Sequence, residues 1–188
     1  MGINFRETKL KGAFVIEPEK FEDERGFFAR SFSRDEFSRH VSTYDFIDSA
    51  ISFNLKKHTV RGMHFQNAPF QQAKLVRCTR GAIYDAIIDL RPDSVTYGQW
   101  VGEILSAENR LMLYVPEGFA HGFQTLEDNT EVFYQMSALY TPKAEGGIRW
   151  NDPFFDMSWP ELGHVIINER DRNFPDFRVS QLALSEDN

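Results

Sequence analysis

The sequence predicts an all-β fold of antiparallel strands with few short helices, in a single domain that spans residues 1–188. The main observation is a series of short apolar runs separated by glycine and proline, which is typical of a β-sandwich or barrel. The second is that helical periodicity is scarce. With 41% hydrophobic and 14% aromatic residues, the chain can bury the core that such a fold needs, which excludes disordered and collagen-like proteins.

The elements follow in chain order. Ser33 and Glu36 have the spacing of a capping box, so we expect one short helix to begin there, with each side chain bonding the other residue's backbone. Asp85 and Asp89 interrupt an apolar run, so they should face solvent or a cavity. From about residue 146 the composition predicts loops and a helical turn packed on the barrel. The predicted strands are 74–78, 82–90, 100–105, 111–115 and 132–139.

Charge and cysteine content exclude several classes of protein. The chain has 21 Lys and Arg against 28 Asp and Glu, and this net charge of −7 argues against a surface that binds nucleic acid or anionic membranes. A small anionic ligand would need a few cations gathered in one pocket. We find no run of 18 apolar residues that could span a membrane. The single cysteine, Cys78, cannot form an internal disulfide and no apolar leader is visible, so we expect a cytoplasmic protein.

Two histidines have informative neighbours, His64 and His121. The second closes a P-x-G-x-x-H element (residues 116–121) that is similar to the one in the cupin fold, a small conical β-barrel. Metal-binding cupins add a second His and an acid after the first, because a divalent cation needs three or four converging ligands. Here Gln follows His64 by two residues, and residues 67–74 hold no acid and end in Lys. The pattern favours a cupin without metal, in which His64 is free for proton transfer.

Six segments carry a family pattern: 23–28 (DERGFF), 61–66 (RGMHFQ), 74–78 (KLVRC), 105–109 (LSAEN), 115–123 (VPEGFAHGF) and 150–153 (WNDP). These motifs resemble the dTDP-4-dehydrorhamnose 3,5-epimerase family, in order from about residue 8 to 175. The resemblance implies a cupin-like jelly-roll β-barrel that acts as a homodimer in deoxysugar biosynthesis and needs no cofactor. It implies an isomerase that inverts C3 and C5, or C3 alone, of a nucleoside-diphosphate 4-keto-6-deoxyhexose, with dTDP as the first choice of nucleotide.

The resemblance also implies the catalytic roles. Epimerisation beside a ketone needs a base on one face of the sugar, an acid on the other, and a donor for the enolate oxygen. His64 would be the base, and Asp171 would orient its ring. Lys74 would stabilise the developing oxyanion, and Tyr134 would return the proton from the opposite face. Without the resemblance, we would interpret Tyr134 as core and Asp171 as part of a solvated charged run.

The implied substrate contacts are mostly charged. Arg25 and Arg61 would clamp the diphosphate, because guanidinium groups suit bidentate pairing with phosphate. Tyr140 would stack on the base. The other substrate-binding positions are His121, Glu145 and Arg170.

Two departures from the family pattern lie on the nucleotide side. Arg30 stands where most members have an acid, and residues 48–50 replace a common Gln-x-Asn. We hypothesise that the base or the sugar substituent differs from the standard substrate, and that Arg30 and Asp48 form a compensating pair.

Three rival functions are weighed against epimerisation. A 3,4-ketoisomerase on the same barrel would use the same base but move the carbonyl group. A non-catalytic cupin would bind a sugar nucleotide without reaction, although the joint presence of His64, Lys74 and Tyr134 argues against it. A metal-dependent oxygenase is a distant third.

Overall fold

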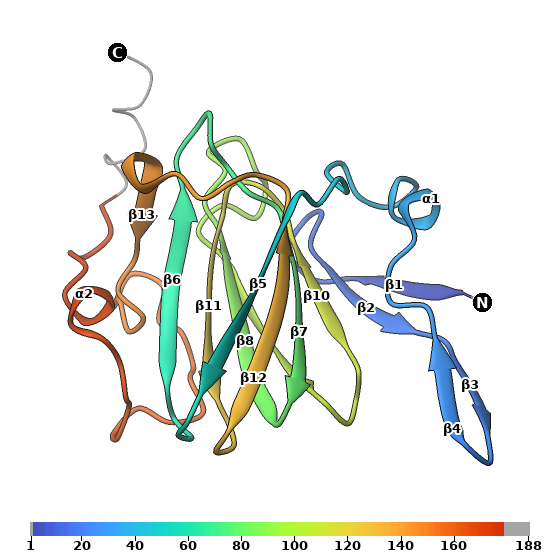
Figure 1. Ribbon diagram of the computed structural model, residues 1–188. Helices are drawn as coiled ribbons and strands as arrows, with labels where there is room; N and C mark the ends of the chain where they lie inside the picture. The colour runs from blue at the N-terminus through green and yellow to red at the C-terminus, as the bar shows by residue number, and fades with distance from the viewer. Residues whose placement is uncertain (1, 179–188) are drawn as a thin grey trace.

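The computed structural model describes residues 2–178, which form two antiparallel β-sheets packed face to face (Figure 1). The six-stranded sheet has the order β1-β2-β10-β7-β12-β5 and the five-stranded sheet the order β13-β6-β11-β8-β9. The expected all-β, cupin-like jelly-roll barrel with few short helices is confirmed. The first sheet comprises β1 (Ile3–Glu7), β2 (Phe14–Pro18), β10 (Met112–Val115), β7 (Lys74–Arg80), β12 (Thr130–Met136) and β5 (Asp48–Asn54). The second comprises β13 (Glu145–Gly147), β6 (Val60–Gln66), β11 (Phe119–Thr125), β8 (Ala82–Asp89) and β9 (Trp100–Ser106).

Four smaller elements flank the sheets: a hairpin, two short helices and a 3-10 turn. Strands β3 (Lys20–Asp23) and β4 (Gly26–Ala29) form a separate hairpin that projects away from the barrel, as Figure 1 shows. Helix α1 (Arg34–Phe37) lies on the same side as the hairpin, whereas α2 (Glu169–Arg172) lies on the opposite side, near β13 and β6. A 3-10 turn, Pro142–Ala144, precedes β13. No helix within residues 2–178 is long and apolar enough to cross a membrane.

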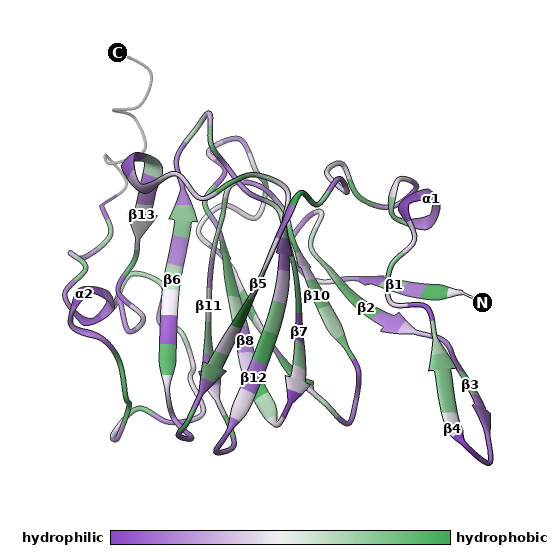
Figure 2. Ribbon diagram, in the orientation of Figure 1, coloured by the Kyte–Doolittle hydropathy of each residue, from purple (hydrophilic) through white to green (hydrophobic). Residues whose placement is uncertain are grey.

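The core fills the space between the two sheets because side chains alternate along each strand. Figure 2 shows this alternation as hydrophobic and hydrophilic bands along β6 and β12. The six-stranded sheet contributes Val76, Leu113 and Val132 to this core. The five-stranded sheet contributes Ile83 and Ile87. One face of β7 and β12 and one face of β8 are therefore directed into the barrel, where the functional side chains also lie.

Each sheet is also covered on its outer face. The segment after β13 packs Trp150 and Trp159 against residues such as Ile88 of the five-stranded sheet. The α1 segment packs Phe37 against Leu75 and its neighbours on the six-stranded sheet. Residues 148–178 thus lie on the barrel as loops and one helical turn, as predicted, and the rest of the predicted tail lies outside the described residues.

The predicted elements correspond closely to observed ones. The runs 74–78, 82–90, 100–105 and 111–115 become β7, β8, β9 and β10, while the run 132–139 becomes β12, which starts at Thr130 and ends at Met136. The capping box forms only in half. Ser33 accepts from the Glu36 amide at 3.5 Å, but the Glu36 carboxylate instead accepts from the amide of Ile3, on an edge strand, at 3.0 Å.

Candidate active site

The site is built around two paired strands, β6 and β11. His64 on β6 lies directly opposite His121 on β11, and Gly147 of β13 is its partner on the other side. The backbones of β6 and β11 approach closely beside these residues. Gly62 has φ = 126°, and a Cβ atom there would lie 2.5 Å from the Cα of Gly122. No side chain would fit there, so the close approach requires glycine. Because the strands lie this close, the two histidines are side by side.

His64 is held by a buried carboxylate from the C-terminal segment. Its Nε2 lies 2.9 Å from Oδ1 of Asp171, which is fully buried, and the other oxygen of Asp171 accepts from the Gly62 amide at 3.1 Å. Asn168 caps α2 by accepting from the Asp171 amide, which places the carboxylate. Burial raises the pKa of Asp171, but the hydrogen bond from His64 and further donors outweigh it and hold that pKa below its usual value. An ionised Asp171 orients the ring and leaves Nδ1 available as a base.

His121 forms a second pair of the same kind. Its Nε2 lies 2.8 Å from Oδ1 of Asp85, a fully buried residue of β8. Oδ2 of Asp85 is buried and has no hydrogen-bond partner. The sequence leaves open whether Asp85 faces solvent or a cavity, and the structure places it inside the barrel. Its charge is close enough to Lys74 to raise the pKa of that amine.

Lys74 and Tyr134 come from the opposite sheet, on β7 and β12. Together with His64 they line two cavities of about 280 and 130 Å³ inside the barrel. Burial lowers the pKa of Lys74 to about 8, against the opposing effects of Asp85 and Glu145. Burial also raises the pKa of Tyr134, so its hydroxyl is protonated at neutral pH. The two cavities therefore bring an imidazole, an ammonium group and a protonated phenol together from both sheets.

The larger cavity is bordered by a chain of polar contacts. The hydroxyl of Tyr140 donates to Glu145 at 2.9 Å, and Arg170 donates to both Glu145 oxygens at 2.9 Å. Arg170 Nη2 lies 3.4 Å from Nε2 of His64. These three predicted substrate contacts are thus brought next to the predicted base. Within residues 2–178, no three side chains of His, Cys, Asp or Glu converge as a metal-binding group.

The two predicted diphosphate contacts lie in different places. Arg61 lines the smaller cavity, and its Nε donates to Oδ1 of Asn54 at 2.8 Å. Arg25 lies outside both cavities of its own chain. It is on the β3–β4 hairpin, where its side chain is 83% exposed and pairs with Asp23. The prediction that Arg25 and Arg61 converge in one barrel mouth is wrong within a single chain, because the hairpin points away from the barrel (Figure 1).

The predicted pair between Arg30 and Asp48 is also wrong. Arg30 lies 3.3 Å from Glu36 of α1, the carboxylate that its segment brings nearest. Asp48 is at the start of β5, where it lines the larger cavity near Tyr134. Burial raises the pKa of Tyr134 most, and the charge of Asp48 raises it further.

Three residues of the site were not predicted. Asp85 gave a partial signal, an acid within an apolar run, but nothing in the sequence joined it to His121. Asn54 holds Arg61, and Phe174 packs its ring edge-on to His64 with centroids 6.2 Å apart. The contacts of Asp85 and Phe174 join residues far apart in the chain, and Asn54 and Arg61 lie on different sheets although they are seven residues apart, so local spacing carries no signal for these contacts.

Known proteins resemble this chain in both sequence and fold. Residues 7–179 match the family model described as dTDP-4-dehydrorhamnose 3,5-epimerase. The enzyme of that name from Escherichia coli K12 is 40% identical over 171 residues, 90% of this chain and 91% of that protein. The Bacillus anthracis Ames structure with TDP and PPi bound superposes with a TM-score of 0.89 at 40% identity, over 94% of this chain and 100% of that chain. The Legionella pneumophila structure in complex with dTDP-4-keto-L-rhamnose has a TM-score of 0.84 at 35% identity, over 90% of each chain.

Proposed function

Because the chain belongs to the dTDP-4-dehydrorhamnose 3,5-epimerase family, we propose that this isomerase inverts both C3 and C5 of a dTDP-linked 4-keto-6-deoxyhexose. The observation that carries the proposal is that His64, Lys74 and Tyr134, from two different sheets, line the same cavities. The relative from Legionella pneumophila was solved with dTDP-4-keto-L-rhamnose, which supports a ligand of this class for the chain.

His64 would remove the proton from the carbon beside the ketone. Its ring is oriented by Asp171, whose negative charge stabilises the imidazolium that forms. The electrons of the broken C–H bond move into an enolate whose oxygen is the former C4 carbonyl oxygen. Lys74 would stabilise this oxygen as an ammonium group, in a cavity where limited solvent strengthens the interaction.

Tyr134 would then donate its hydroxyl proton to the same carbon from the other face. It is suited to this role because β12 lies in the sheet opposite β6, so His64 and Tyr134 approach a ligand from different walls. A proton taken on one face and returned on the other inverts the carbon. His64 then releases its proton to solvent and Tyr134 takes one up, which restores both groups. The same steps at the second carbon beside the ketone complete the reaction.

Arg61 would bind the diphosphate at the smaller cavity, while Tyr140, Glu145 and Arg170 would bind the nucleoside at the larger one. The ion pair of Glu145 with Arg170 gives that end both donors and acceptors. His121, backed by Asp85, would donate to the sugar. Arg30 and Asp48 depart from the family pattern on the nucleotide side, so the identity of the nucleotide base has to be measured. Turnover of the dTDP-linked and CDP-linked sugars under the same conditions decides it, and a clear CDP preference would overturn the dTDP assignment.

A homodimer accounts for the position of Arg25. The hairpin that carries it exposes Phe28 (63%), and the edge strand β5 exposes Ile51 (63%). Figure 2 shows β4 as hydrophobic along its length, and an uncovered apolar edge favours association. In such a dimer, Arg25 of one copy would reach the diphosphate bound in the other. We place this dimer in the cytoplasm, in keeping with the single thiol.

Mixing two inactive variants tests the shared site. Arg25→Ala and His64→Ala homodimers would each lose activity, but subunit exchange would create mixed dimers with one intact site. Recovery of up to about a quarter of the wild-type activity supports the arrangement. No recovery despite exchange, seen with a mass-tagged subunit, would show that Arg25 does not act in the site of the other copy.

Solvent deuterium incorporation tests the reaction itself. Incubation of the dTDP-linked 4-keto-6-deoxyglucose in deuterated water should place label at both C3 and C5, with inverted configuration. Label at C3 alone would restrict the enzyme to one inversion. Relocation of the carbonyl, followed by NMR, would instead show the 3,4-ketoisomerase, and an unlabelled substrate would indicate a non-catalytic binding protein.

A further inference from the structure

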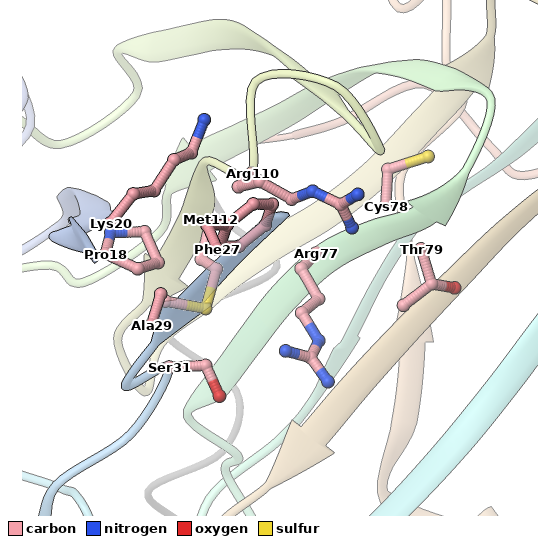
Figure 3. A pocket seen from close by; sticks show the side chains of 10 residues that line it. All are labelled: Pro18, Lys20, Phe27, Ala29, Ser31, Arg77, Cys78, Thr79, Arg110 and Met112. Carbon is pink, nitrogen blue, oxygen red and sulfur yellow. The ribbon is translucent and has the colours of Figure 1, made fainter. Parts of the chain in front are cut away.

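Arg61 brings a guanidinium group to the smaller barrel cavity, and no other arginine of residues 2–178 lines that cavity. Its positive charge lowers the pKa of Tyr134, against the larger effect of burial, so the two groups lie near each other. Arg77 and Arg110, by contrast, line a cavity on the outer face of the six-stranded sheet, beside the β3–β4 hairpin (Figure 3). How Arg61 is held therefore decides where this cavity presents a guanidinium group.

The side chain of Asn54 holds Arg61 in place. Asn54 is the last residue of β5 and Arg61 lies near the start of β6, so their contact joins the two sheets. Oδ1 of Asn54 accepts from Nε of Arg61 at 2.8 Å, and Asn54 is only 2% exposed. Because Asn54 is buried, little water competes for this hydrogen bond.

The amide group of Asn54 is itself fixed by the strands around it. Its Nδ2 donates to the backbone carbonyl of Ser52 at 3.1 Å and to that of Thr130 at 3.4 Å. Thr130 is the register partner of Asn54 on the neighbouring strand β12. With the amide donors directed at these carbonyls, the amide oxygen faces Arg61. The pairing of β5 with β12 thus sets the acceptor for Arg61 before any ligand binds.

This contact leaves one edge of the guanidinium group for a ligand. Arginine has donors on Nε and on its two terminal nitrogens. Since Nε bonds to Asn54, the two terminal nitrogens remain for a bidentate pair with a phosphate group. Asn54 accepts its hydrogen bond without a negative charge, so it does not neutralise Arg61 as a carboxylate would.

We propose that Asn54 is a positioning residue, which holds Arg61 ready for the diphosphate and leaves the charge of Arg61 to that ligand. The inference rests on the proposed function, in which Arg61 binds the diphosphate. A mobile arginine would lose side-chain freedom when the ligand binds, and the bond to Asn54 removes part of that cost beforehand. Asn54 acts through Arg61, because Asn54 itself lines neither barrel cavity.

Calorimetric titration of dTDP into Asn54→Ala tests the proposal. The affinity should fall by about three- to tenfold, because the positioning hydrogen bond is lost. The affinity for thymidine, which lacks the diphosphate, should be unchanged. Gln124→Ala is the matched control: Gln124 is also a buried amide, but it bonds to the backbone of Glu161, so its loss should leave dTDP affinity unchanged.

Arg61→Gln separates positioning from a purely structural role. This variant should weaken dTDP binding by about tenfold or more, because it removes the charge-assisted hydrogen bonds. In the Arg61→Gln background, Asn54→Ala should cause no further loss, since the two residues act through one contact. A full additional loss in the double variant, or an equal loss of thymidine affinity in Asn54→Ala, would make Asn54 a structural residue of β5 and overturn the proposal.

Asn54→Asp keeps the test open if the alanine variant does not fold. The carboxylate has the same shape and accepts from Arg61, but it neutralises the charge, so dTDP affinity should fall by about tenfold or more. Wild-type affinity for dTDP in Asn54→Ala or Asn54→Asp overturns the proposal. If Arg61→Gln also binds dTDP like the wild type, the assignment of Arg61 to the diphosphate fails as well, whereas deuterium labelling tests the epimerisation separately.

Discussion

His64 and His121 are direct partners in the register of β6 and β11, and each places its Nε2 against a different buried carboxylate. The two pairs differ in exposure. The side chain of His64 is 28% exposed, whereas that of His121 is 8% exposed. His64 can therefore meet a substrate carbon, while His121 acts from deeper in the barrel. This difference supports the proposed roles, in which His64 is the base and His121 a hydrogen-bond donor.

His64→Ala should abolish deuterium incorporation at both C3 and C5, because one imidazole serves both carbons. A loss of kcat of roughly 10²–10⁴-fold is expected for a missing general base. Affinity for dTDP, measured by calorimetry, should change little, since the proposed nucleotide contacts of Arg61, Tyr140 and Arg170 remain in place. Incorporation that persists at one carbon would assign that carbon to another base.

Asp171→Asn should lower kcat by about 10²-fold or more with little change in KM, because the amide cannot stabilise an imidazolium. The pKa of Asp171 is lowered in the folded state, so its charge stabilises the fold above about pH 4, and that stabilisation is lost as pH falls through the lowered pKa. Urea unfolding between pH 3 and 7 should therefore show a weaker pH dependence in the variant. An unchanged kcat would reduce Asp171 to a purely structural role.

The activity should fall as pH rises through about 8, because Lys74 then loses its proton and stabilises the enolate oxygen less. The measurement is kcat/KM against pH. Lys74→Arg is the diagnostic variant, since its guanidinium stays charged and the alkaline limb should move to higher pH. A limb that stays at the same pH in this variant belongs to another group.

Asp85→Asn should move that alkaline limb to lower pH. Asp85 raises the pKa of Lys74, so its removal leaves the effect of burial less opposed. Asp93→Asn is the control, because Asp93 is exposed in the loop after β8 and its removal should leave the limb in place. If the alkaline limb lies at the same pH in both variants, Asp85 does not raise the pKa of Lys74.

Tyr134→Phe should retain proton removal but lose inversion. The hydroxyl that returns the proton is missing, while His64 and Lys74 are intact. Label from deuterated water should then appear in the recovered substrate with little product formed. A parallel loss of exchange and inversion would make Tyr134 a structural residue of β12.

The strands around the site were predictable because their signals are local. Apolar alternation over 74–78 and 82–90 corresponds to β7 and β8, and the motifs around His64 and His121 lie on β6 and β11. The helix at Ser33 was found for the same reason. The reciprocal half of its capping box was not, because Glu36 bonds to β1, which lies 33 positions away in sequence.

By itself, the sequence determined the barrel strands, the residue types of the chemistry and the family to which they belong. Only the tertiary structure decided which charges meet. Asp85 bonds to His121, and Arg30 pairs with Glu36 rather than with Asp48. Arg25 lies on a hairpin outside its own barrel. The physical reason is that strand formation depends on neighbours in the chain, whereas ion pairs depend on sheet register and on how the sheets pack.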